Sequence, residues 1–331
     1  MKKLLLIFCF PILCFSQQSF NFIHDGINRE YIYYSPNNLP VNAPLVFVAH
    51  GFTGSAIGIM GYSGMNTIAD QNGFAVCYPK GTVDNWGNNF WNVGYDFHFG
   101  VTVDDVGFLE SLALYLQSTY QLSTTNTFIT GMSNGGEICY SLAFDGSNVF
   151  KAYAPVAGSV FPNGTVNNLF NPNTPVPFFI THGDNDNVTL YDGDLNDQFW
   201  GPYLGVDTLV DFWVNENSLT SVNIDTFPDL NNDGNITISK KYYSPLTNNE
   251  VWLYVHQNDH SWGDSDIIIE QEIWDFFSLY INNSSEVLDY SNNKKLVSIS
   301  NLFGQKINKS NNTFLLFLYD DGSVEKKLLL K

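Results

Sequence analysis

Apolar runs and helical repeats alternate along most of this 331-residue chain. The apolar runs predict buried strands at residues 43–49, 74–78, 128–130, 176–180 and 250–256. Behind Asp104 and Asp105, apolar residues recur at helical spacing, at Val106, Leu109, Ala113 and Leu116. We interpret the two carboxylates as structural, because negative charge at a helix N-terminus complements the helix dipole. The pattern predicts an α/β fold with a mostly parallel sheet and helices on both of its faces.

The third predicted strand runs directly into Gly131-Met132-Ser133-Asn134-Gly135, a G-x-S-x-G pattern at the start of a predicted helix. A serine hydroxyl becomes an effective nucleophile at an exposed, sharp turn, next to a base and facing donors for an oxyanion. Gly131 and Gly135 permit such a turn, and the helix beginning near Asn134 directs its free N–H groups toward the developing negative charge. Ser133 is therefore the candidate nucleophile.

An acid and a base follow Ser133 in the order expected for an α/β-hydrolase, which is Ser, then Asp, then His. Asp184 and Asp186 lie just after the fourth predicted strand, and His260 lies just after the fifth. The carboxyl ends of parallel strands meet at one edge of a sheet, so these groups can converge although they are far apart in sequence. We predict a triad of Ser133, Asp186 and His260, with Asp184 as the alternative acid.

The first predicted strand ends in a glycine-bearing loop ahead of the nucleophile, His50-Gly51-Phe52-Thr53-Gly54. In α/β-hydrolases the oxyanion accepts one hydrogen bond from the N–H after the nucleophile and another from a loop after an earlier strand. The predicted donors are therefore the backbone N–H groups of Asn134 and Phe52, with Thr53 as the alternative to Phe52.

Four motifs together resemble those of secreted polyhydroxybutyrate depolymerases and of the related feruloyl and acetyl-xylan esterases. They are Gly131-Met132-Ser133-Asn134-Gly135-Gly136, His50-Gly51-Phe52, His182-Gly183-x-x-Asp186-x-Val188 and His260-Ser261-Trp262. The stretch at residues 103–108 strengthens the resemblance, which spans roughly residues 21–280. It implies an α/β-hydrolase fold, a Ser-His-Asp triad and hydrolysis of carboxylic esters without a metal or another cofactor. The implied partner is an ester substrate derived from a polymer, either polysaccharide-linked feruloyl or acetyl groups or a hydroxybutyrate polyester.

Aromatic residues are dense between residues 86 and 99, where Trp86 and Trp91 lie in a long predicted loop. Aromatic rings stack on sugars and phenolic groups and pack against polyester chains, so Trp86, Trp91 and Trp262 are candidate substrate-binding residues. Packing of the rings beneath the loop is an equally open interpretation. A competing function is that of a non-catalytic surface protein that uses the aromatic loop to bind glycan.

The segment Asp229-Leu230-Asn231-Asn232-Asp233-Gly234 begins like the calcium-binding loop of an EF-hand. The twelfth loop position, which should hold a bidentate Glu, is Lys240, and residues 236–239 alternate as a strand instead of forming a helix. We therefore interpret the segment as a hairpin turn, and we expect no metal site in the chain.

The N-terminus has the features of a secretory signal peptide over residues 1–16. Two lysines precede an apolar run at residues 4–15, which is too short to anchor in a bilayer, and the small Ser16 follows. We expect a secreted or cell-surface protein with no integral membrane segment once this peptide is removed. Of the four cysteines, Cys77 and Cys139 then remain, and we expect two buried thiols because a strand separates their elements.

The formal net charge is −19 at pH 7, from 33 acidic and 14 basic residues. So acidic a surface repels phosphate backbones and anionic membranes alike. We therefore expect no nucleic-acid partner, and we expect a soluble protein that acts on neutral or weakly charged substrates.

The composition changes near residue 281, where a polar linker separates a predicted catalytic domain at residues 17–281 from a tail at residues 282–331. Within the tail, three strands are predicted at residues 296–299, 313–319 and 324–330, with a hairpin turn at 320–323. The tail resembles the C-terminal sorting domain of type IX secretion substrates, which implies the secretion machinery as a partner. The alternative is a small β appendage that packs on the main domain.

Overall fold

The computed structural model describes residues 19–162, 175–282, 296–301, 313–319 and 324–329. The chain divides into two compact units, Met1–Asn282 and Asn283–Lys331. The predicted signal peptide, most of the predicted linker and the predicted turn at 320–323 lie outside the described residues.

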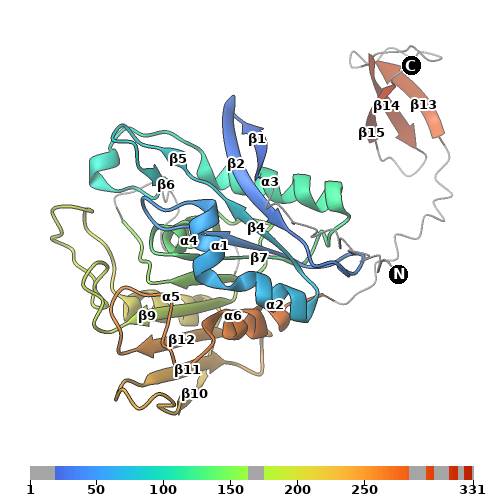
Figure 1. The fold of residues 1–331 in the computed structure, drawn as a ribbon. Helices are drawn as coiled ribbons and strands as arrows, with labels where there is room; N and C mark the ends of the chain where they lie inside the picture. The colour runs from blue at the N-terminus through green and yellow to red at the C-terminus, as the bar shows by residue number, and fades with distance from the viewer. Residues whose placement is uncertain (1–18, 163–174, 283–295, 302–312, 320–323, 330–331) are drawn as a thin grey trace, which may run out of the picture. The chain divides into compact units, whose positions relative to one another are not determined.

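Ten strands form one continuous sheet in the first unit (Figure 1). In their order across the sheet, they are β1 (Ser19–His24), β2 (Ile27–Tyr34), β4 (Ala75–Pro79), β3 (Leu45–Ala49), β7 (Thr127–Met132), β8 (Tyr153–Val156), β9 (Phe178–Gly183), β12 (Val251–His256), β11 (Thr237–Tyr243) and β10 (Ser221–Thr226). The strands from β4 to β12 in this order pair in parallel, whereas the two strands at each end pair antiparallel. A separate short ribbon joins β5 (Thr82–Val83) and β6 (Asn89–Phe90).

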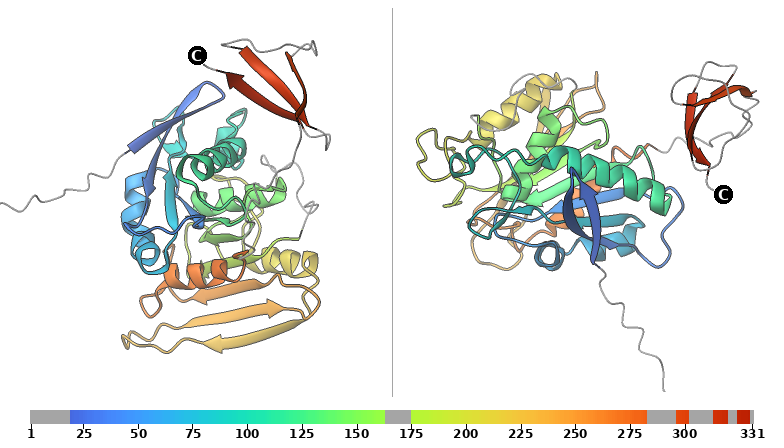
Figure 2. Two further views of the ribbon diagram at one scale, coloured as in Figure 1. Left: turned by 90° about the vertical axis from the view of Figure 1, so that its right-hand side faces the viewer. Right: turned by 90° about the horizontal axis from the view of Figure 1, so that it is seen from above.

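Helices cover both faces of this sheet, as Figure 2 shows from two further sides. One face packs against α1 (Ala56–Ser63), α2 (Met65–Asn72) and α6 (Ile269–Ser278). The other packs against α3 (Asp105–Tyr120), α4 (Asn134–Phe144) and α5 (Val206–Glu216). A short 3-10 helix, η1 (Asp96–His98), lies in the aromatic loop. The predicted arrangement of a mostly parallel sheet between two layers of helices is confirmed.

The central strands are apolar along their whole length because both of their faces are covered. Every residue of β3, β4 and β7 is buried. Parallel strands place all of their carboxyl ends at one rim, where the loops that follow them can meet. The buried centre of the sheet therefore provides a fixed base for those loops.

The start of α3 shows how carboxylates stabilise this unit. Asp104 caps the helix and accepts a hydrogen bond from the amide of Gly107 over 2.8 Å, as a structural role requires. Asp105 is buried, forms a 2.5 Å ion pair with Arg29 of β2, and accepts a 2.7 Å hydrogen bond from the amide of Asn92. The second carboxylate therefore joins the helix to the sheet and to the aromatic loop.

Two further predictions concern the cysteines and the tail. Cys77 and Cys139 are free and buried, as predicted. The second unit is an antiparallel sheet of β13 (Leu296–Asn301), β14 (Thr313–Tyr319) and β15 (Val324–Leu329), so the three predicted strands are confirmed. Among the described residues, no helix has the length and apolar character needed to cross a membrane.

Candidate active site

Ser133 lies at the turn between β7 and α4 with a φ of 55° and a ψ of −120°. A positive φ strains a residue that has a side chain, and it persists where the surrounding structure enforces it. A Cβ atom at Gly131 would lie 2.3 Å from the carbonyl oxygen of Gly135, and one at Gly135 would lie 2.2 Å from that of Ala49. Only glycine fits at both positions. The G-x-S-x-G pattern therefore forms the sharp turn that the sequence predicted.

The loop after β3 lies against this turn. A Cβ atom at Gly51 would lie 4.0 Å from the Oγ atom of Ser133. The amide of Thr53 donates to a backbone carbonyl of the aromatic loop over 2.8 Å, so it is not free to bind an oxyanion. Within the described part of the chain, the backbone N–H groups of Phe52 and Asn134 donate no hydrogen bond. The geometry therefore favours Phe52 over Thr53 as the donor from this loop.

Asp186 and His260 meet in the loops after β9 and β12. The Nδ1 atom of His260 and the Oδ2 atom of Asp186 are 2.7 Å apart. The Oδ1 atom of Asp186 accepts hydrogen bonds from the amides of Val188 and Thr189 at 2.8 and 2.9 Å, which fixes the carboxylate. Asp184 is exposed, so the structure pairs His260 with Asp186 and not with the alternative acid.

The three predicted triad residues follow parallel strands of one sheet. Ser133 comes directly after β7, and Asp186 and His260 follow β9 and β12. The side chain of His260 is 17% exposed, so it is partly open to solvent. No hydrogen bond joins its ring to the hydroxyl of Ser133 among the residues that the structure describes.

The charge state of Asp186 suits it to orient an imidazole. Burial alone would raise the pKa of its carboxyl, but hydrogen bonds from His182 and His260 outweigh burial and hold the pKa well below its ordinary value. Asp186 is therefore ionised at neutral pH and can stabilise a positive charge on His260. His182 is buried, and its Nε2 atom lies 2.7 Å from the carbonyl oxygen of Thr189, which indicates a structural role.

The sequence predictions missed one ionisable group beside the turn, Glu137 in the first turn of α4. Its buried carboxyl accepts hydrogen bonds from the hydroxyl of Tyr95 at 2.5 Å and from the side-chain amide of Asn134 at 3.2 Å. The Oδ1 atom of Asn134 in turn accepts a 2.7 Å hydrogen bond from the amide of Trp91. Burial raises the pKa of Glu137 to about 7. The sequence offered one signal that could have revealed this group, because Glu137 is the single charged residue of its helix.

The structure corrects the substrate-binding prediction for one of the three tryptophans. Trp91 is 0% exposed, because its indole N–H donates to the carbonyl oxygen of His50 over 2.9 Å and its ring packs in the core. Trp262 is 6% exposed and its ring packs against that of Tyr62, but it also lines a surface hollow, so it stays a candidate. Trp86 is 65% exposed and stays a candidate for contact with substrate.

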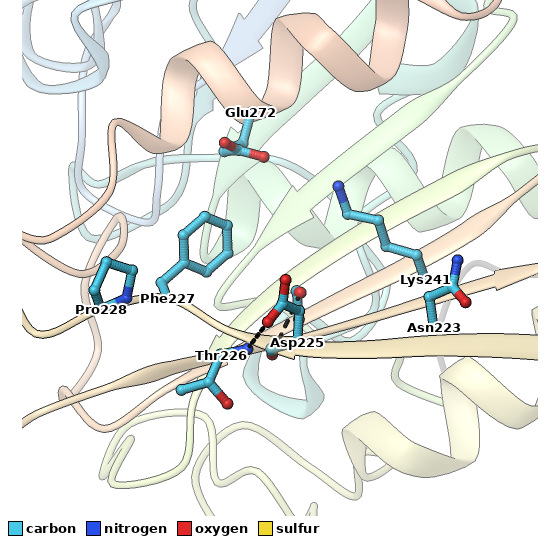
Figure 3. A pocket seen from close by; sticks show the side chains of 8 residues that line it. Asn223, Asp225, Thr226, Phe227, Pro228, Lys241 and Glu272 are labelled. Atoms are coloured by element: carbon cyan, nitrogen blue, oxygen red, sulfur yellow. Dashed lines mark hydrogen bonds between the residues drawn. The ribbon is translucent and has the colours of Figure 1, made fainter.

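Two hollows lie near these loops. One of about 680 Å³ adjoins the loop that carries His260, and Tyr62, Asp259 and Trp262 are among the residues that line it. The other, of about 400 Å³, lies between α6 and the outer strands β10 and β11 (Figure 3). Lys241 on β11 and Glu272 on α6 line this second hollow, but none of the predicted site residues does. Of the two, only the first is lined by residues next to the candidate base, Asp259 and Ser261.

The strand order, the parallel centre and the loops at its carboxyl rim are those of the α/β-hydrolase fold. A solved acetyl xylan esterase from Aspergillus awamori aligns with a TM-score of 0.53 and 16% identity. The alignment covers 79% of this chain and 98% of that one. At such low identity the likeness shows the fold alone, and it confirms the predicted fold class.

Within this fold, residues 30–169 match the family described as Esterase PHB depolymerase. A bifunctional acetylxylan esterase/xylanase of Neocallimastix patriciarum is 29% identical over 50% of this chain and 22% of its own length. A probable feruloyl esterase C of Aspergillus niger is 26% identical over 55% of this chain and 64% of its own length. The chain thus spans less than two thirds of these relatives. The resemblance predicted from the motifs is confirmed.

Proposed function

We propose that the protein is a secreted serine esterase in which Ser133 attacks a carboxylic ester, His260 is the general base and Asp186 orients that base. The observation that carries the proposal is the 2.7 Å contact between His260 and Asp186, in loops that follow strands of the same parallel sheet as the strained Ser133. The family match and the esterases among the relatives support the same class of reaction.

The first half of the reaction transfers the acyl group to the enzyme. His260 takes the proton of the Ser133 hydroxyl as Oγ attacks the ester carbonyl carbon, and Asp186 stabilises the imidazolium that results. The oxyanion accepts hydrogen bonds from the amides of Phe52 and Asn134. The tetrahedral intermediate then expels the alcohol, which takes the proton from His260. An acyl group remains on Ser133.

The second half of the reaction regenerates the enzyme. His260 takes a proton from water as the water oxygen attacks the acyl carbon. The second tetrahedral intermediate then releases the carboxylic acid, and His260 returns the proton to the Oγ atom of Ser133. We expect the hydrogen bond between Ser133 and His260 to form in the substrate complex, because catalytic hydrogen bonds commonly shorten and align only there.

The substrate that we propose is a polymer-linked ester, either a feruloyl or acetyl group on polysaccharide or a hydroxybutyrate polyester. The names of the relatives include acetylxylan and feruloyl esterases, which supports the polysaccharide-linked esters. The exposed ring of Trp86 offers a flat apolar surface for the acyl or polymer part.

We also propose a role for each segment of the chain. Residues 1–16 are a signal peptide for export, and residues 17–281 form the catalytic domain. The tail at residues 282–331 binds the secretion machinery. The support for export is the charged and apolar pattern of the N-terminus. The support for a separate tail is that β13, β14 and β15 form a sheet of their own.

The experiment compares wild type with Ser133→Ala on a nitrophenyl ester, methyl ferulate, acetylated xylan and hydroxybutyrate oligomers. We expect wild type to hydrolyse at least one of them and Ser133→Ala to lose at least about 10⁴-fold in kcat. Ser118→Ala, on the exposed side of α3, is the matched control and should keep full activity.

Two outcomes would contradict the proposal. Turnover retained by a correctly folded Ser133→Ala, as judged by circular dichroism, would remove Ser133 from the mechanism. Wild type that retains polysaccharide on a column but hydrolyses none of the esters would favour the competing glycan-binding function.

A further inference from the structure

The loop between β10 and β11 and the segment after His260 bring three carboxylates together. One carboxylate oxygen from each of Asp229, Asp233 and Asp266 lies within 4.8 Å of the other two. We propose that these three residues bind a calcium ion, which joins the β10–β11 loop to the segment that carries His260. The proposal departs from the expectation, drawn from the sequence, that the chain has no metal site.

The spacing of the three oxygens fits a shared cation. Calcium binds oxygen ligands at about 2.3–2.6 Å, so two ligands on opposite sides of one ion lie about 5 Å apart. Three oxygens within 4.8 Å of one another can therefore all contact the same ion. In the described part of the chain, no Lys, Arg or His forms an ion pair with any of these carboxylates. A cation would remove their mutual repulsion.

Asp266 provides the independent sign of a ligand. Its Oδ1 atom accepts hydrogen bonds from the amides of Leu230 and Asn231 at 2.9 and 3.0 Å. Its Oδ2 atom is buried and has no hydrogen-bond partner among the described residues. Native structures rarely leave a buried carboxylate oxygen unsatisfied, because its lost hydration is not replaced. A cation held by Asp229 and Asp233 would satisfy this atom.

The chemistry of the site selects a hard cation. The available ligands are carboxylate oxygens, which Ca²⁺ prefers. Transition metals favour nitrogen and sulfur ligands instead. The loop is already curled, since the two oxygens of Asp229 accept hydrogen bonds from the amides of Asp233 and Gly234 at 3.2 and 3.0 Å. The carboxylate that the sequence pattern lacks at Lys240 would come from Asp266, in a different loop.

The proposed ion lies where it would restrain the loop of the candidate base. Asp266 follows His260 in the same loop, and hydrogen bonds already join this region to the β10–β11 side. The hydroxyl of Thr237 donates to Asp264 over 3.0 Å, and the amide of Ile236 donates to the side chain of Gln257 over 3.0 Å. An ion bound beside these contacts should therefore stabilise the whole region against heat.

The experiment uses the purified mature chain, stripped of metal with a chelator and then titrated with CaCl2 by calorimetry. We expect one calcium site per chain and a higher Tm in millimolar CaCl2, because a ligand that binds only the folded state stabilises it. Asp266→Asn should bind calcium at least about tenfold more weakly and lose most of the rise in Tm.

Two further variants make the test decisive. Asp233→Asn changes an exposed side chain, so it should fold like wild type and still bind calcium more weakly. Asp211→Asn removes the same charge from an exposed position on α5 and should bind calcium like wild type. The proposal is overturned if wild type binds no calcium at millimolar concentration, or if Asp266→Asn and Asp233→Asn both bind it like wild type. Neither readout depends on ester hydrolysis.

Discussion

The turn that carries Ser133 and the loop that carries His260 are held in place by different kinds of contact. Around Ser133 the neighbours are backbone atoms, since even a Cβ atom at Gly135 would lie 2.2 Å from a carbonyl oxygen of β3. Around His260 the contacts are made by side chains. The carboxylate of Asp186 is hydrogen-bonded to the ring of His260 over 2.7 Å. The hydroxyl of Tyr62 accepts a hydrogen bond from the amide of Trp262, in the same loop, over 3.0 Å.

The Ser133 turn is therefore fixed by steric contacts, whereas the His260 loop is held by contacts that a side-chain substitution can remove. The nucleophile turn is enforced by close packing, and close-packed backbone has few alternatives. The loop of the base is held by side-chain hydrogen bonds, and in our proposal also by a calcium ion, so single side-chain substitutions can loosen it.

Gly135→Ala is expected to have the largest effect on stability. The added methyl carbon would lie 2.2 Å from the carbonyl oxygen of Ala49, which cannot move without displacing β3. We expect the free energy of unfolding to fall by about 4 kcal/mol, measured by urea denaturation. Gly61→Ala in α1 is the control, because nothing lies within 4 Å of a Cβ atom there. Equal stability of the two variants would contradict the steric explanation.

Glu137→Gln is expected to change how stability depends on pH. The pKa of Glu137 is 4.5 without the fold and about 7 within it, so the folded chain holds the proton more strongly. Stability should therefore fall as the pH rises between these two values. At about 1.4 kcal/mol per unit, the loss across this window reaches about 3 kcal/mol.

Thermal or urea unfolding of both proteins from pH 5 to pH 8 checks this expectation. The free energy of unfolding of Glu137→Gln should decline less with pH than that of wild type, because glutamine keeps the hydrogen-bonding shape and does not titrate. Glu110→Gln, on the partly exposed side of α3, should follow wild type. If the free energies of unfolding of wild type and Glu137→Gln change with pH in the same way, burial does not raise the pKa of this carboxyl.

Local patterns predicted the elements, and the chain order of Ser133, Asp186 and His260 predicted the contact between the last two. The directions of individual side chains were missed where they depend on distant residues. The strands, the glycine-flanked turn and the tail strands follow from local patterns, and all of them are present. Trp91 was placed in a binding loop because its residue type suits a cleft, but its ring direction depends on a hydrogen bond to His50, which lies far away in sequence. Asp266 was missed for the same reason, since only the fold brings it to Asp229.

The most direct test of a triad is covalent labelling with a fluorophosphonate, followed by mass spectrometry of the peptides. A working triad places the label in wild type on Ser133, and it makes Asp186→Asn react slower by about 10³-fold or more, because His260 loses the charge that orients it. A label on another residue, no label at all, or an equal rate in Asp186→Asn would contradict it.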